Sequence, residues 1–209
     1  MKIYTLIALL FVNTIIGCES SLITSSWKSE STPAIKRNKI MVVALVGGND
    51  DHELRENIEN HLMGDLSEKG YTVISAYKTY GPKAFENLSE SQALNKLSNA
   101  GVEAVLTIVL LNKEKEKYYV PGRVYYTPYT IYHRRFWGYY STMYDRTYEP
   151  GYYSEETNYF LEYNLYDLET KALLYSAQTK SFNSDSAEKL AHENDKLIVT
   201  DLLTKKVLK

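Results

Sequence analysis

One short segment constrains the fold of this chain more than any other. Lys39–Val46 reads KIMVVALV, in which β-branched and other apolar residues occupy successive positions. Successive side chains of a strand point to opposite faces of the sheet, so this pattern is typical of a strand covered on both faces. The segment therefore predicts a central strand in a sheet that helices cover on at least one face.

The residues that follow alternate between helical and extended patterns. Apolar residues recur at a spacing of four, which predicts a helix, and two further strands flank a shorter helix. The first helix carries Leu54, Ile58, Leu62 and Leu66; the strands are expected over Tyr71–Tyr77 and Val102–Leu111, and the shorter helix from Asn87. Such alternation indicates a partly parallel sheet.

The carboxyl-terminal part predicts a hairpin and a final helix. Thr157–Asp167 alternates in polarity, a polar turn follows, and Ala172–Phe182 returns as the paired strand. Asp185 and Glu188 resemble a capping box at the start of the last helix. The expected order is β-α-β-α-β, an insertion, then β-β-α. This order predicts an α/β (α+β) fold with a mixed β-sheet and helices packed on the sheet.

The first eighteen residues, MKIYTLIALLFVNTIIGC, predict export. Lys2 precedes an apolar run, Ile3–Ile16, that is too short for an ordinary transmembrane helix and fits the core of a signal peptide. The run ends in I-I-G-C, which resembles the lipobox of bacterial lipoproteins, although that family commonly carries Ala or Ser where Ile16 stands. The resemblance implies cleavage after Gly17 and a diacylglycerol and palmitate anchor on Cys18. An ordinary signal peptide with an incidental cysteine is the alternative.

The chain therefore divides into three expected parts. Residues 1–17 are the signal peptide, and residues 18–38, rich in Ser, Thr, Lys and Glu, are a lipidated flexible tether. Residues 39–208 form a single α/β domain with an aromatic insertion at 118–153. Trp27 is the one large apolar side chain in the tether, so it either marks a first strand docked on the domain or lies at the membrane interface.

The body of the chain carries a second resemblance. The segments LRENIENHL, AGVEAVLTIVLL and LYDLETKALLYS look like those of small uncharacterised envelope lipoproteins of Gram-negative bacteria. In architecture the chain is also similar to the TolB amino-terminal domain and to lipoprotein activators of penicillin-binding proteins. Arg55 and Glu59 match a recurring Arg/Glu pair in the first helix, which we interpret as a solvated helix surface, with a partner contact as the alternative. The resemblance implies a fold and a compartment and no chemistry.

Motifs for catalysis, metals or cofactors are not found. His52, Glu53 and Glu56 spell H-E-L-R-E, which lacks the second imidazole of the zinc-protease pattern. Ser25 and Lys28 fit S-x-x-K, but they fall in the expected tether and the companion motifs are absent. A net charge of -2 offers no basic field for nucleic acid. We therefore predict a protein that is not an enzyme and that holds no metal or cofactor.

Twelve of the twenty tyrosines lie in one segment, residues 118–153. Three explanations stay open: the rings pack on their own domain, bind a protein partner, or form a platform for a glycan such as peptidoglycan. Tyr, Trp and Arg are the residue types enriched in protein interfaces. The expected exposed tip, and so the candidate partner-binding site, contains Arg134, Arg135, Phe136, Trp137, Tyr139 and Tyr140.

Together these features predict a lipid-anchored protein of the Gram-negative envelope, facing the periplasm from the outer membrane. Glu19 follows the cysteine where an inner-membrane retention signal often places Asp, which favours the outer membrane. The expected role is that of a non-enzymatic accessory or assembly factor that binds an envelope protein. A glycan- or peptidoglycan-binding module is the alternative, and a hydrolase with an unrecognised site is a third.

Overall fold

A computed structural model describes residues 20–30, 39–46, 52–120, 152–182 and 186–208. The chain forms two compact units. The first comprises Met1–Lys113 and Asn158–Lys209, and the second comprises Glu114–Thr157. We describe the two units separately.

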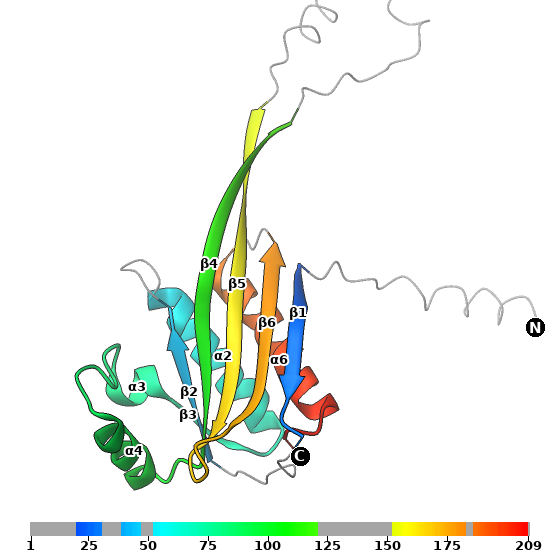
Figure 1. The fold of residues 1–209 in the computed structure, drawn as a ribbon. Coiled ribbons are helices and arrows are strands. Elements are labelled where there is room, and N and C mark those ends of the chain that lie inside the picture. Colours follow the sequence, from blue (N-terminus) through cyan, green and yellow to red (C-terminus); the bar gives the residue numbers. More distant parts are fainter. Residues whose placement is uncertain (1–19, 31–38, 47–51, 121–151, 183–185, 209) are drawn as a thin grey trace, which may run out of the picture. The chain divides into compact units, whose positions relative to one another are not determined.

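The first unit is built on a mixed sheet of six strands in the order β1-β6-β5-β4-β2-β3 (Figure 1). The strands are β1 (Ser21–Lys28), β2 (Lys39–Leu45), β3 (Thr72–Ser75), β4 (Ala104–Val120), β5 (Tyr152–Asp167) and β6 (Leu173–Phe182). β2 runs parallel to both β3 and β4, whereas β6 is antiparallel to β1 and β5. The predicted fold class, a mixed sheet with helices packed on it, is confirmed.

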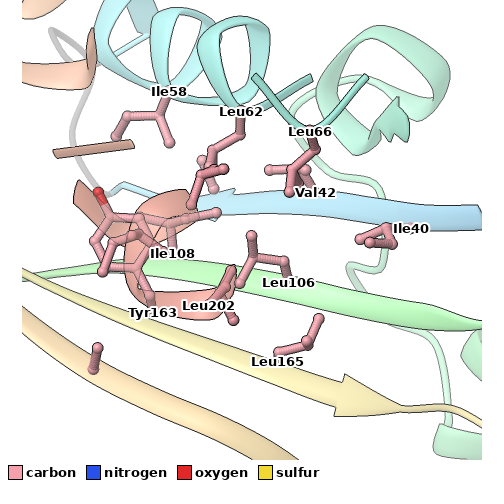
Figure 2. Close-up of a cluster of buried hydrophobic side chains, with 14 of the residues drawn as sticks. Ile40, Val42, Ile58, Leu62, Leu66, Leu106, Ile108, Tyr163, Leu165 and Leu202 are labelled. Carbon is pink, nitrogen blue, oxygen red and sulfur yellow. The ribbon is translucent and has the colours of Figure 1, made fainter. Parts of the chain in front are cut away.

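Helices cover β2 on both of its faces. The helices are α2 (His52–Glu68), α3 (Ala76–Tyr80), α4 (Glu90–Asn99) and α6 (Ala187–Thr204). α2 and α6 enclose the larger core, and Figure 2 shows its labelled members Ile40, Val42, Ile58, Leu62, Leu66, Leu106, Ile108, Tyr163, Leu165 and Leu202. A second core on the opposite face contains Met41, Val43, Ala76, Leu97, Val102 and Val105. The continuous apolar run of β2 is therefore explained by burial on both faces.

Part of the expected tether belongs to the sheet. Ser21–Lys28 forms β1, the outermost strand, which pairs antiparallel with β6. The prediction that all of residues 18–38 are a flexible tether is wrong for this stretch, and the alternative interpretation of Trp27 as part of a docked strand is confirmed. Polar residues dominate β1 because an edge strand buries little side-chain surface.

The observed helix starts differ slightly from the expected ones. Ser89 caps α4 in a complete capping box with Gln92, two residues after the predicted start. Ser186 caps α6 by accepting a hydrogen bond from the Lys189 N–H, one residue after the predicted cap, Asp185, which lies outside the described residues. β3 ends at Ser75 because the Ser75 hydroxyl caps α3, which shortens the strand predicted to reach Tyr77.

Candidate functional site

The predicted partner-binding residues are flanked by two described strand ends. Cys18 and all six of the predicted tip residues lie outside the described residues. The described part of the second unit consists of the last residues of β4 and the first residues of β5, which flank the centre of the aromatic segment. Their side chains are the part of the candidate site whose geometry is known.

A pair of tyrosines lies at the ends of these two strands. The ring centroids of Tyr119 and Tyr153 are 5.3 Å apart, with an angle of 59° between the ring planes. Tilted rings at this distance attract one another through their quadrupoles. The two residues are nevertheless 54% and 74% exposed, respectively. These two rings therefore pack on each other and leave most of their surface open to contact.

An ion pair lies next to this tyrosine pair on the same two strands of the second unit. Lys117 Nζ lies 2.6 Å from the Glu155 carboxylate, and both side chains are largely exposed. The hydrogen bond and charge of Lys117 lower the pKa of Glu155, and Glu155 in turn raises the pKa of Lys117. Such a cross-strand ion pair favours the antiparallel register while the strands remain in water. The described part of the second unit thus presents a solvated ladder that carries exposed rings.

A second candidate is the Arg/Glu pair of α2, which the structure places differently from the prediction. Glu59 is only 1% exposed, so the interpretation as a solvated surface pair is wrong. Its Oε1 accepts a hydrogen bond from the Ala44 N–H at 2.9 Å, and Oε2 accepts from the Tyr77 N–H at 2.9 Å and from the Ser75 hydroxyl. Burial raises the pKa of Glu59, and the three donors and Arg55 partly offset that rise.

Arg55 completes this polar cluster. Its guanidinium donates hydrogen bonds to the carbonyls of Val46 and Pro82 and lies 5.9 Å from the centre of the Tyr77 ring. A cavity of about 340 Å³ adjoins both side chains at the carboxyl end of β2. Clefts at this end of parallel strands often hold ligands. Here, however, Glu59 accepts from two backbone N–H groups and the Ser75 hydroxyl, and Arg55 donates to two backbone carbonyls, which ties α2 to β2 and α3. The Arg55 Nε is buried and has no hydrogen-bond partner among the described residues.

The two weak catalytic patterns gain nothing from the structure. His52, Glu53 and Glu56 occupy the start of α2 on exposed positions, and the His52 ring lies 6.4 Å from the Tyr77 ring. Among the described residues, no cluster of three or more His, Cys, Asp or Glu side chains is placed to hold a metal ion. Lys28 lies on β1, and its Nζ donates to the Lys205 carbonyl at 2.7 Å. That contact directs the ammonium toward α6 and not toward Ser25.

Within the described ranges, no helix combines the length and the apolar character needed to cross a membrane.

Comparisons with known proteins add partial structural likenesses. No protein-family model matches the chain, and no curated protein matches it. The chain is similar to the PelC dodecamer from Paraburkholderia phytofirmans, with 13% identity, a TM-score of 0.44, and coverage of 90% of this chain and 99% of that one. It is similar to the lipoprotein GNA1162 from Neisseria meningitidis, with 15% identity, a TM-score of 0.43, and coverage of 79% and 98%. It is also similar to the hypothetical protein CT253 from Chlamydia trachomatis, with 9% identity, a TM-score of 0.43, and coverage of 82% of this chain and 98% of that one. No function follows from likenesses this distant.

Proposed function

We propose that this chain is a lipid-anchored envelope protein that acts without catalysis, by binding a protein partner through its aromatic segment. The segment, residues 118–153, holds most of the tyrosines of the chain. The lipid anchor is the acylated Cys18 that the lipobox resemblance implies. The proposed place is the periplasmic face of the outer membrane.

The observation that carries the proposal is the exposure of the Tyr119–Tyr153 pair. Two large rings that lie 5.3 Å apart and are each more than half exposed offer aromatic surface to a partner. Tyrosine offers much contact area while losing few rotamers on binding, and its hydroxyl is solvated when the partner is absent. Rings whose main task was to pack on their own unit would be buried instead.

Lipid anchoring fits the same proposal. Each buried methylene group contributes about 0.8 kcal/mol to membrane binding, so several acyl chains on one residue hold a domain at a bilayer. A tethered domain meets membrane partners at a raised effective concentration, so a modest aromatic contact is sufficient.

The test is co-purification from detergent-solubilised envelopes with the full chain as bait. We expect a stoichiometric envelope protein to be retained, and to be lost when Trp137 and Tyr139 are both replaced by Ala. The matched control is Leu88→Ala, because Leu88 is an exposed apolar residue of the first unit. Retention of the same partner by the Trp137/Tyr139 variant would contradict the proposal.

Sedimentation with purified cell-wall sacculi separates the glycan alternative. If the full chain sediments with sacculi and the same double substitution releases it, the aromatic segment binds glycan and not protein. Under the proposal, the chain stays in the supernatant.

A further inference from the structure

The edge of the sheet formed by β1 exposes apolar side chains. Within the described residues, no strand pairs with the outer side of β1 (Figure 1). Trp27 and Leu22 are 50% and 43% exposed on this strand. An edge strand offers unpaired N–H and C=O groups to another chain, and proteins usually blunt such edges with charge, Pro or bulges. β1 has one bulge, between Ile23 and Ser25, and one charged residue, Lys28.

The pairing with β6 shows which way the β1 side chains point. Ser21, Ile23 and Ser26 pair with the buried residues Ser181, Thr179 and Ala177, so they lie on the face covered by α6. Leu22 and Trp27 pair with Lys180 and Ser176 and therefore lie on the opposite face. The bulge keeps both apolar residues on that one face although they are five positions apart.

A groove runs along the covered side of the same edge. It has a volume of about 420 Å³, and its lining includes Ile23 of β1 and Leu197, Glu193 and Thr200 of α6. α6 runs parallel to β1, because Ser21 donates to Glu193 near one end and Lys28 donates to the Lys205 carbonyl at the other. The edge thus combines an unpaired strand with a partly apolar groove.

The residue pattern of β1 is self-complementary in one antiparallel register. If Leu22 stands opposite Trp27 of a second copy, Ile23 stands opposite Ser26 and Ser21 stands opposite Lys28. In this register every opposing pair points to the same face, both apolar pairs meet on the face away from α6, and the two bulges lie at the two-fold axis. Opposing apolar and aromatic residues on one face stabilise antiparallel strands.

The charged side chains near the two ends of β1 are also consistent with this register. Glu193 lies beside Ser21, whereas Lys28 lies beside Lys205. In one chain the two ends of β1 are about 23 Å apart, at roughly 3.3 Å per residue, so Lys28 does not reach Glu193. Across the two-fold axis, Lys28 and Lys205 of the second copy come beside Glu193. Within one chain Lys205 already lies 3.7 Å from the Asp201 carboxylate. The second copy would therefore add a cationic neighbour for Glu193, namely its Lys28.

We propose that β1 pairs antiparallel with β1 of a second copy of this chain, and that the two sheets continue into one across a two-fold axis. This homodimer is independent of the partner-binding role of the aromatic segment. An isologous interface of this kind is the commonest arrangement in soluble oligomers.

Disulfide trapping in the full chain tests the register. Opposing residues of antiparallel strands have Cα atoms about 4.5–5.5 Å apart, which a disulfide spans. Within one strand, positions 22 and 27 are about 15 Å apart, which it does not span. Leu22→Cys and Trp27→Cys chains with different tags are co-expressed, and each variant is also expressed alone. The parental chain controls for disulfides made by Cys18.

We expect a covalent product of twice the chain mass, carrying both tags, in the mixture alone. Absence of this product while both variants accumulate like the parental chain overturns the proposal. A cross-link to a different protein also overturns it, because β1 then pairs with another partner. Both positions are exposed, so neither substitution disturbs the core.

A charge exchange tests the ionic contacts independently. In the trapping background, Glu193→Lys and Lys28→Glu are each expected to lower the cross-link yield several-fold, and the double exchange is expected to restore it. If each single change acts only by disturbing its own chain, the double variant should have a still lower cross-link yield. That result would contradict an ionic contact between the two copies.

Discussion

Removing the Glu59 carboxylate tests whether it ties α2 to the sheet. Glu59→Ala takes the acceptor from the buried Ala44 N–H and the partly buried Tyr77 N–H, each at 2.9 Å, and from the buried Ser75 hydroxyl. An unsatisfied buried donor costs about 1–3 kcal/mol. The two buried donors, the Ala44 N–H and the Ser75 hydroxyl, predict a loss of about 2–6 kcal/mol in the free energy of unfolding, which is large against the total stability of a typical domain.

Urea denaturation of the full chain, followed by circular dichroism, measures this loss. Glu56→Ala is the matched control, because Glu56 is an exposed residue of the same helix three positions earlier. The control is expected to change the free energy of unfolding by about 0.5 kcal/mol or less. Glu59→Ala and Glu56→Ala curves with equal midpoints would refute the structural role that we assign to Glu59.

Two further perturbations follow from the structure and the sequence. Asp195 is fully buried, and burial raises its pKa well above 3.8. The folded state therefore favours the protonated carboxyl more than the unfolded state does. The stability that this preference provides is fully present below pH 3.8 and is lost as the pH rises through the folded-state pKa. Asp195→Asn, which stays uncharged, is therefore expected to gain stability relative to the parental chain as pH rises from about 4 to about 8 in urea titrations. Cys18→Ser is expected to abolish metabolic labelling with palmitate and release the protein from the membrane fraction; continued labelling would contradict the anchor.

The central parts of the fold were predictable from the sequence for a clear reason. A strand buried on both faces leaves a continuous apolar run, as in β2, and a helix covering one face leaves a spacing of four, as in α2. The β5–β6 hairpin was predictable because its alternation is regular and its turn is polar. In each case one local pattern is enough to predict the element, because apolar residues fill each face of the strand or helix that is buried.

Features that depend on distant parts of the chain were not predictable. β1 reads SLITSSWK, and polar residues on both faces hide the fact that it pairs with β6, which follows some 150 residues later. Glu59 resembled half of a surface ion pair, and only the folded chain brings the Ala44 and Tyr77 N–H groups to it. A helix cap shifts by a residue or two because several neighbouring side chains are able to accept the same hydrogen bond.

The candidate site shows the same division. The density of tyrosine in residues 118–153 was visible from the sequence. The contact between Tyr119 and Tyr153, which lie 34 positions apart, depends on the pairing of β4 with β5. A sequence offers no signal for which two of many rings meet, because alternation places rings on both faces.

Site-specific photocrosslinking in living cells tests the central claim most directly. A photoreactive amino acid replaces Tyr153 or Tyr119 in the full chain, and in the control it replaces Lys69, an exposed residue at the end of α2. We predict that both tyrosine positions cross-link to one envelope protein of defined mass and that position 69 does not. No protein adduct at either tyrosine position, or the same adduct at all three, would contradict a partner-binding aromatic segment.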